Sequence, residues 1–407
     1  MNYLSNLLDG VKVEWKALGD VCDFQNGFAF KSNLFRDEGL PIVRITNIDG
    51  TNVDLSDIKY FNPSDYNSGN PINYSIVKGD ILIAMSGATT GKIGYYNLNE
   101  TAYLNQRVGK FIPNKALVNN RYLYHFLLTK TEFLNILAGG GAQPNLSSNS
   151  IKEKLEIPIP CPDNPEKSLE IQREIVRILD TFTELTAELT AELTARKKQY
   201  HYYRDQLLSF EDSEVEWKRL EEIANFSQGI QVDIENQFNE EREDLVRFLR
   251  IVDFVKNNET PRYIINPGQR YLKREGDLVM IRYGASAAGK VFLCHSGAIA
   301  NNMFKINLIS NAITTKFLFT YLSQTKVYNS LNSSGGTSTM PAITFSQIGS
   351  VKIPVPSPEE QERIVAILDK FDSLTTSISE GLPKEIELRK KQYEYYRDML
   401  LTFPKDN

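Results

Sequence analysis

The chain has 407 residues, is 41% hydrophobic and 24% charged, and carries a net charge of −5 at pH 7. This composition excludes a disordered or collagen-like chain, and the length predicts two or three domains. Three widely spaced cysteines, with no CxxC pair, favour a reducing compartment over a disulfide framework or a zinc site. No apolar run approaches about 18 residues, and no signal-peptide pattern opens the chain, so we expect a cytoplasmic protein without a membrane span.

The charge is unevenly distributed. Residues 1–160 are neutral overall and residues 214–356 carry +2, whereas residues 161–213 carry −4 and residues 357–407 carry −3. The acidic excess therefore lies in two segments whose apolar spacing predicts helices. The remaining parts are balanced enough to hold local basic faces, which permits a polyanionic partner without requiring one.

Residues 1–163 predict a first α+β domain. The apolar runs Pro41–Ile45 and Asp80–Met85 predict short buried strands. The aromatic-rich stretch Arg121–Leu128 predicts a short helix, and the glycine-rich segment 139–145 predicts a loop.

Residues 164–212 predict one long helix. Apolar or stem-packing side chains recur from Ile171 to Leu207 in steps of three and four, with one extra step of four at a TAEL repeat. About 42 residues without Gly or Pro make a rod of roughly 60 Å. Its apolar stripe is narrow, so the helix needs a partner helix.

Residues 213–356 repeat the first domain. Val13-Glu14-Trp15-Lys16 recurs as Val215-Glu216-Trp217-Lys218, and Gly79-Asp80-Ile81 recurs as Gly276-Asp277-Leu278. Strands are expected at 245–252 and 278–281, and a helix at 316–322. A period near 200 residues indicates a duplicated domain rather than a solenoid.

Residues 357–407 repeat the long helix with a difference. Arg196-Lys197-Lys198-Gln199-Tyr200 recurs as Arg389-Lys390-Lys391-Gln392-Tyr393, but four extra residues lie in the second copy, around Gly381-Leu382-Pro383. Proline should break the helix there. Ser357 and Glu360 predict its start, with a capping box. We therefore expect an antiparallel pair of long coiled-coil helices, one continuous and one broken, with two similar globules at opposite ends and a pseudo-two-fold internal repeat.

Catalytic motifs are missing. Without a Pro-Pro pair, the chain lacks the loop with which amino-methyltransferases hold a flipped base. Gly284–Lys290 has the spacing of a phosphate-binding loop, but Val291 stands where Ser or Thr would hold magnesium, which favours a structural turn. The three histidines are scattered, with no triad or metal-ligand spacing. We expect no catalytic residue, no metal site and no enzymatic activity from this chain by itself.

The pattern RKKQYxYYRD ends both helical regions. It is interpreted either as a coiled-coil end with a solvated charged face or as a docking face for other subunits, since Tyr and Arg are common in interface cores. Direct DNA contact is a third interpretation. The candidate docking residues are Arg196, Lys197, Tyr200, Tyr203, Arg204, Arg389, Lys390, Tyr393, Tyr396 and Arg397.

Two variable globules opening near E-W-K-x-L, two helices carrying Q-x-x-I-V-x-I-L-D-like and RKKQYxYYRD segments, and a TAEL repeat resemble the specificity subunit of a type I restriction–modification system. The resemblance covers essentially the whole chain. It implies that each globule is a target recognition domain reading one half of a split double-stranded DNA site, while the helices set the gap between the halves. It also implies two modification (methyltransferase) subunits, which bring S-adenosylmethionine, and restriction subunits that use ATP and Mg.

DNA-facing residues are nominated by chemistry, because Arg, Lys, Asn and Gln read base edges and basic or hydroxyl side chains bind phosphate. The candidates are Arg44, Asn47, Lys92, Gln106, Arg107, Gln143 and Asn145 in the first globule and Arg250, Arg282, Tyr283, Lys290, Asn302 and Thr337 in the second.

Two alternatives remain open. A coiled-coil protein-interaction scaffold would share the helices but show no salt-dependent DNA affinity. A nuclease or methyltransferase with a degraded motif would show cofactor-dependent activity as an isolated chain.

Overall fold

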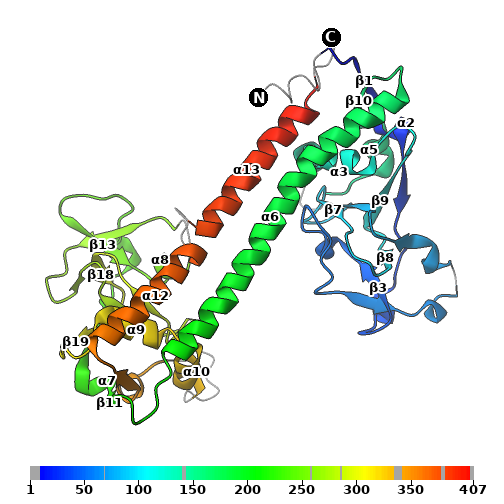
Figure 1. Ribbon diagram of the computed structural model, residues 1–407. Helices are drawn as coiled ribbons and strands as arrows, with labels where there is room; N and C mark the ends of the chain where they lie inside the picture. Colours follow the sequence, from blue (N-terminus) through cyan, green and yellow to red (C-terminus); the bar gives the residue numbers. More distant parts are fainter. Residues whose placement is uncertain are drawn as a thin grey trace. The chain divides into compact units, whose positions relative to one another are not determined.

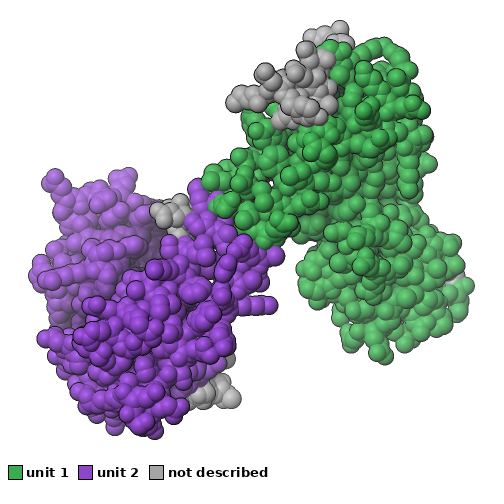
Figure 2. Space-filling view, in the orientation of Figure 1, with its two compact units in different colours: residues 1–190, 385–407 green, residues 191–384 purple. Residues whose placement is uncertain are grey.

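The computed structural model describes residues 10–67, 69–139, 144–256, 259–284, 287–333, 342–376 and 381–403. The chain forms two compact units, Met1–Thr190 with Glu385–Asn407 and Ala191–Lys384 (Figure 2). Each unit contains one globule and parts of the long helices. The division therefore falls inside the helices and not at the ends of the four regions expected from the sequence.

Three small sheets and a group of short helices build the first globule. Two four-stranded sheets have the orders β2-β9-β6-β7 and β4-β3-β8-β5, and β1 pairs with β10. Only β3 and β8 run parallel among these described pairs. The elements are β1 (Val13–Ala17), α2 (Leu18–Val21), β2 (Cys22–Asn26), β3 (Leu40–Val43), β4 (Lys59–Phe61), β5 (Ser75–Ile76), β6 (Ile81–Ala84), β7 (Ile93–Tyr95), β8 (Ala102–Leu104), β9 (Val108–Pro113), α3 (Asn120–Leu128), α4 (Thr131–Leu137), α5 (Ser148–Lys154) and β10 (Glu156–Pro160).

The second globule repeats this topology strand for strand, as β12-β19-β16-β17, β14-β13-β18-β15 and β11-β20. The duplication predicted from sequence is confirmed. The elements are β11 (Glu216–Arg219), α7 (Leu220–Ile223), β12 (Ala224–Gln228), β13 (Leu245–Leu249), α8 (Val252–Val255), β14 (Arg262–Ile265), β15 (Leu272–Lys273), β16 (Leu278–Ile281), β17 (Val291–Leu293), β18 (Gly297–Ile299), β19 (Met303–Leu308), α9 (Thr315–Leu322), α10 (Thr325–Ser333), α11 (Phe345–Gly349) and β20 (Lys352–Val355).

The predicted buried strands are confirmed, but three of them are shorter than expected. β3 ends at Val43 and not at Ile45, and β6 covers Ile81–Ala84 and not Asp80–Met85. All four residues of β6 and of β16 are buried. Their alternate side chains enter different cores: Ile81 and Ile83 pack with the helices, while Leu82 and Ala84 pack with the neighbouring sheet. A strand covered on both faces needs no polar alternation, which explains the continuous apolar runs. The run expected over 245–252 was too long, since β13 ends at Leu249 and helix α8 follows.

The long helices match the sequence pattern. Helix α6 (Pro165–Leu207) is continuous over 43 residues, whereas its partner is split into α12 (Pro358–Thr376) and α13 (Gly381–Leu401), as Figure 1 shows. Pro383 falls in the first turn of α13, where a missing N–H costs nothing. The predicted break is confirmed.

The start of α12 is only partly as expected. The Ser357 hydroxyl accepts the Glu360 N–H at 3.3 Å, and the Ser357 carbonyl accepts the Gln361 N–H. The Glu360 carboxylate does not close a capping box, however. It pairs with Arg363 at 2.7 Å instead, because a bidentate guanidinium competes well for a carboxylate.

The helix pairing is antiparallel. In the first unit Phe182 stacks on Tyr396 with ring centroids 5.2 Å apart, and in the second unit Tyr203 meets Phe371 at 5.7 Å. The earlier half of α6 thus contacts the late part of α13, and the later half contacts α12. The predicted stripe missed Leu179, which is fully buried in the core of the first globule. Within the described residues no helix is long and apolar enough to cross a membrane.

Candidate DNA-reading edges and helix anchors

Three segments far apart in the sequence meet at one edge of the first globule. The Met85 N–H donates to the Arg107 carbonyl at 2.8 Å, and the Leu146 N–H donates to the Met85 carbonyl at 2.7 Å. Ser86 also forms a bridge with Asn145. These bonds place the end of β6, the β8–β9 turn and the segment before α5 side by side. We call the group Met85, Ser86, Gln106, Arg107 and Asn145 the first reading edge.

The second globule repeats this arrangement. The Arg282 N–H donates to the Asn302 carbonyl at 2.8 Å, and the Ile343 N–H donates to the Arg282 carbonyl at 2.9 Å. Tyr283 forms the corresponding bridge with Ala342. The second reading edge comprises Arg282, Tyr283, Asn301, Asn302 and Ala342. Backbone bonding is the same at both edges, but the side chains differ.

Several nominated residues lie on these edges with side chains available. Gln106, Arg107 and Asn145 are exposed, and no described residue accepts a hydrogen bond from the Arg107 guanidinium. The half-buried Arg282 lies over the rings of Tyr283, at 5.0 Å, and of Phe345. Its Nε is buried and has no hydrogen-bond partner in the described part of the chain.

The structure says less about the other residues nominated for DNA binding. Lys92 is half-buried and Lys290 is exposed, each directly after a glycine with positive φ, Gly91 or Gly289. Gln143 and Thr337 lie outside the described residues.

Three nominated residues have structural partners instead. Asn47 is 3% exposed; its Oδ1 accepts the Arg44 N–H, and its Nδ2 donates to the carbonyls of Asp54 and Asp57. The Arg44 guanidinium donates to the Asp57 carbonyl at 3.2 Å. These bonds bracket the backbone after β3, so neither side chain is poised for a base edge.

Arg250 has the same internal role in the second globule. Its Nε lies 3.0 Å from the Asp253 carboxylate, which is almost fully buried, and its Nη2 donates to the Thr260 carbonyl. Arg247 also pairs with Asp253 at 2.6 Å. These guanidinium bonds, together with the Arg250 N–H, outweigh the burial that would raise the pKa of the Asp253 carboxyl, and they hold it below its ordinary value.

A repeated glutamine fixes each globule to its helix. Gln172 of α6 is fully buried; its Oε1 accepts the Asn119 N–H at 2.8 Å, and its Nε2 donates to the Leu117 carbonyl. Gln361 of α12 does the same for the Thr314 N–H, at 2.9 Å, and the Ala312 carbonyl. Asn119 and Thr314 are the N-caps of α3 and α9. Each glutamine therefore orients an aromatic helix of its globule.

A repeated aspartate forms a second anchor. Asp180 of α6 pairs with Arg121 of α3, and Asp369 of α12 pairs with Lys316 of α9. In the first unit His125 is also buried, with Nε2 2.8 Å from Asp180 and Nδ1 2.8 Å from the Tyr393 hydroxyl. Thr320 holds the corresponding place in the second unit, and its hydroxyl donates to the Lys316 carbonyl of its own helix. The first anchor is the more extensive one.

The nominated docking residues divide between interior and surface. Tyr393 contacts His125, Tyr396 stacks on Phe182, and the buried Arg204 donates to the Ser323 carbonyl at 3.3 Å. Lys197, Lys390 and, at 38%, Tyr203 are exposed.

Other nominated positions bond along their own helices or into the core. Arg196 and Arg389 bond glutamates and glutamines of α6 and α13, Arg397 pairs with Asp398, and Tyr200 is partly buried against the second core. Sequence reasoning missed Tyr202 and Tyr395, which are 59% and 66% exposed and occupy the same position of the two repeats. Their exposure depends on helix rotation, which the spacing alone did not reveal.

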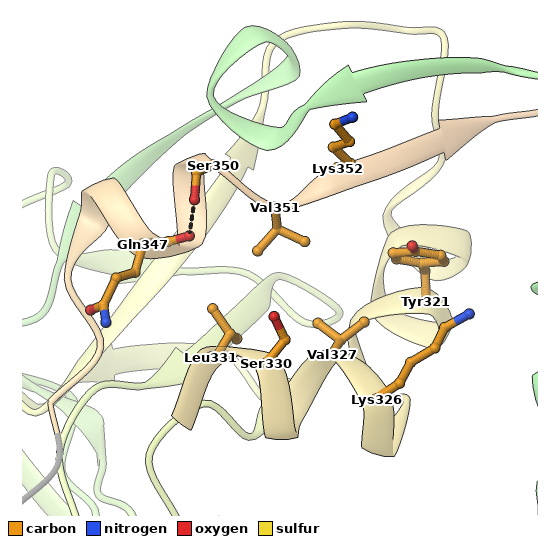
Figure 3. A pocket seen from close by; sticks show the side chains of 9 residues that line it. All are labelled: Tyr321, Lys326, Val327, Ser330, Leu331, Gln347, Ser350, Val351 and Lys352. Carbon is orange, nitrogen blue, oxygen red and sulfur yellow. Dashed lines mark hydrogen bonds between the residues drawn. The ribbon is translucent and has the colours of Figure 1, made fainter. Parts of the chain in front are cut away.

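A hollow of about 410 Å³ opens between α10, α11 and β20 in the second unit (Figure 3). Val327, Leu331 and Val351 give it an apolar floor, and Lys326 and Lys352 also line it. Burial raises the pKa of the lining Tyr321 to about 12, so its hydroxyl stays protonated. The lining includes no His, Cys, Asp or Glu, and no group of three such residues elsewhere in the described chain could hold a metal ion. This hollow has no acid–base pair.

The chain contains two copies of one α+β scaffold, and each copy is anchored to a long helix. Each also has an edge with its own set of polar side chains. These features define a duplicated recognition protein. Comparison with known proteins gives its family. The model of the type I restriction modification DNA specificity domain matches twice, at residues 11–196 and 212–388.

Full-length relatives agree with this match. The chain is 38% identical to the EcoR124I/EcoR124II type I restriction enzyme specificity subunit of Escherichia coli, over 100% of this chain and 98% of that protein. It is 32% identical to the EcoprrI specificity subunit of the same species, over 93% and 92%. The chain therefore belongs to the type I restriction–modification specificity subunits, which recognise DNA and are not catalytic.

Solved structures show the same fold at lower identity. A chain from a study of complex assembly and conformational transition of the type I R-M system matches with a TM-score of 0.62, at 17% identity and 96% and 97% coverage. An S subunit from M. genitalium matches with a TM-score of 0.51, also at 17% identity, over 98% of both chains.

Proposed function

We propose that the two reading edges each read one half of a bipartite double-stranded DNA site, separated by a gap of fixed length. One observation carries this proposal: both edges have the same backbone hydrogen bonds but different side chains. Two half-sites of different sequence require the same backbone arrangement in both globules but different side chains to contact the bases.

Partner docking uses the exposed sides of the helices. Tyr202 on α6 and Tyr395 on α13 repeat, and Leu388 and Met399 extend the exposed stripe on α13, at 49% and 40%. Spacings of seven and eleven residues place these three α13 side chains on one face. Exposed Tyr, Leu and Met suit a protein interface. The exposed tyrosine is present on both helices, which fits two modification subunits that supply S-adenosylmethionine, and restriction subunits supply the ATP- and Mg-dependent steps.

The test is co-expression with a type I modification subunit, followed by genome-wide mapping of methylated bases. Two short blocks separated by a constant number of unspecified bases are expected. Exchange of one globule for that of another specificity subunit should then change one block only. A stable complex that methylates no bipartite motif would favour the coiled-coil scaffold instead.

A further inference from the structure

A hollow of about 380 Å³, lined by apolar side chains and by several side-chain amides, adjoins the second reading edge. It is built by the segment after β12, by the β18–β19 turn and by the end of β13. Side-chain amides dominate its polar lining. The polar residues are Gln231, Gln237, Arg250, Asn301 and Asn302.

Two of these amides brace each other. Asn301 Nδ2 donates to Gln231 Oε1 at 3.1 Å. The Gln231 Nε2 donors and the Asn301 Oδ1 acceptor then have no partner among the described residues. The pair therefore presents a donor next to an acceptor in a fixed relation. Adenine offers the complementary set in the major groove, an acceptor at N7 and a donor at N6.

The remaining polar side chains of the hollow differ in whether they already have hydrogen-bond partners. Gln237 donates to the Val232 carbonyl at 2.9 Å, and Arg250 pairs with Asp253. Both side chains are therefore engaged within the globule and line the hollow without offering a free hydrogen-bonding group there. Asn302 Oδ1, in contrast, is buried and has no hydrogen-bond partner among the residues that the structure describes. A buried acceptor without a partner costs free energy unless a ligand or water donates to it.

The first globule shows which parts of this arrangement both globules share. Gly27 and Gly229 hold the same place, because a Cβ there would lie only 2.0 Å from the Asn105 carbonyl oxygen or 2.2 Å from that of Ala300. Two positions after each glycine stand Ala29 and Gln231. The β8–β9 turn carries Gln106 and Arg107 where the β18–β19 turn carries Asn301 and Asn302. The glycine and the turn are therefore the same in both globules, whereas the polar side chains beside them differ.

We propose that Gln231 and Asn301 form an adenine-reading amide pair, with Asn302 as a third contact, and that Arg107, which stands at the place of Asn302, reads a base in the first globule. This assignment rests on the proposed function and names its readers. Arg107 is exposed and suits the paired acceptors of guanine. The two half-sites are thus expected to differ, with an adenine read by the amide pair in one and a guanine read by Arg107 in the other.

The charged side chains around the hollow indicate on which side the phosphate backbone of a bound duplex would lie. Asp233 and Glu235 follow Gln231 and are exposed. They repel phosphates on that side. Arg282 donates its N–H to the Asn302 carbonyl, and the phosphate backbone is expected to lie near this cation.

The experiment uses the complex with modification subunits and duplexes in which each base pair of the mapped motif is replaced in turn. Gln231→Ala and Asn301→Ala should both relax the same single position, where an A·T preference of about 5- to 150-fold falls to near one. Gln231→Glu, which replaces the donor by an acceptor, should shift that position toward cytosine. Arg107→Ala should relax a guanine position in the other half-site.

Asn329→Ala is the matched control, because Asn329 is an exposed amide on α10 of the same globule. It should change nothing. A uniform loss of methylation with unchanged preference, or no change at all, in both Gln231 and Asn301 variants would overturn the amide pair while leaving the proposed function intact. A wild-type complex without any bipartite motif would overturn the proposed function first, and the amide pair with it.

Discussion

The Nδ1 atom of His125 lies 2.8 Å from the hydroxyl of Tyr393, a residue 268 positions later in the chain. Since His125 Nε2 faces the Asp180 carboxylate, the neutral imidazole donates from Nε2 and accepts the tyrosine proton at Nδ1. Burial raises the pKa of Tyr393, which keeps that proton in place. One histidine thus joins a globule to both α6 and α13 within the first unit.

The Asp180 carboxylate should be the most costly anchor residue to neutralise. In Asp180→Asn, Arg121 and His125 lose a charged acceptor in a half-buried site, and the first unit should lose about 1.5–3 kcal/mol of its free energy of unfolding. Asp369→Asn is the control. Its pair with Lys316 is about half exposed on both sides, so about 0–1 kcal/mol is expected. Urea unfolding of both variants checks this, and equal losses would contradict it.

Acid should loosen the first anchor more than the second. Burial, helped by Arg121 and Arg397, lowers the pKa of His125 below its ordinary 6.5, although Asp180 opposes the shift. Between 6.5 and the lower folded pKa, the unfolded chain binds a proton that the folded chain does not. The free energy of unfolding therefore falls as the pH drops below about 6.5.

The Asp180 carboxyl adds a second loss at lower pH. Burial would raise its pKa, but hydrogen bonds from His125 and Arg121 prevail and hold it below 3.8, so its stabilisation disappears only in strong acid. Hydrogen exchange of α3 and α9 at pH 7.5 and 5.5 separates the two units. Protection should fall in α3 and not in α9, where Thr320 replaces the histidine. His125→Gln should remove the difference, and persistence of the difference in that variant would refute the assignment.

Much of this architecture was predictable because it repeats. Heptad spacing and the recurring RKKQY block predicted both long helices and the break near Pro383. The apolar runs of β6 and β16 predicted buried strands. Spacing did not reveal that Leu179 and Gln172 turn toward the globule, because periodicity describes one stripe and these residues belong to a second. The anchors were therefore missed.

The reading edges were only partly predictable for a related reason. Arg, Asn and Gln could be nominated by chemistry, but burial and pairing decide which remain available. Asn47 and Arg250 looked equivalent to Arg107 in the sequence, yet their hydrogen bonds close within the globule. Gln231 was overlooked because its partner Asn301 lies 70 positions away. The contact depends on the parallel bridge between Ile230 and Ala300, which no local pattern specifies.

Gly27 and Gly229 should tolerate no side chain. A Cβ at Gly27 would overlap the Asn105 carbonyl, which belongs to the turn that carries the first reading edge. Gly27→Ala should destabilise the first globule by about 1–3 kcal/mol or more, and methylation should then require the second half-site alone or be lost. Gly268→Ala is a control in open space at φ +95°, where about 1 kcal/mol of backbone strain is expected and no displaced turn. Unfolding curves and motif mapping measure both, and unchanged recognition in Gly27→Ala would contradict this role of Gly27.

The exposed tyrosines should matter for assembly and not for folding. Tyr395→Ala removes a 66% exposed ring, so the free energy of unfolding should stay within about 0.5 kcal/mol of wild type. Binding of a modification subunit should weaken by about 1–2 kcal/mol, which is typical for an interfacial tyrosine. Tyr393→Phe is the reverse case: it removes the bond to His125 and should lower stability with little effect on docking. Titration calorimetry and unfolding distinguish them, and a Tyr395 variant that binds normally would exclude this face.

The TAEL repeat should set the gap between the half-sites. Helix α6 runs through it without interruption, and the Thr186 and Thr190 hydroxyls bond the carbonyls one turn earlier, at 2.8 and 2.7 Å. Inserting one more TAEL unit therefore extends a regular helix by roughly 6 Å and about 40° of rotation. A base pair adds about 3.4 Å and about 34°. The tolerated gap should grow by one or two base pairs while both half-sites keep their sequence.

Deletion of one unit should shorten the gap by the same amount. A four-residue insertion beside Gly268, in an open turn, should change neither the gap nor the half-sites. Methylome mapping of the three variants reads both quantities at once. Altered half-sites at a constant gap would show that α6 acts on the reading edges and does not measure the distance between them.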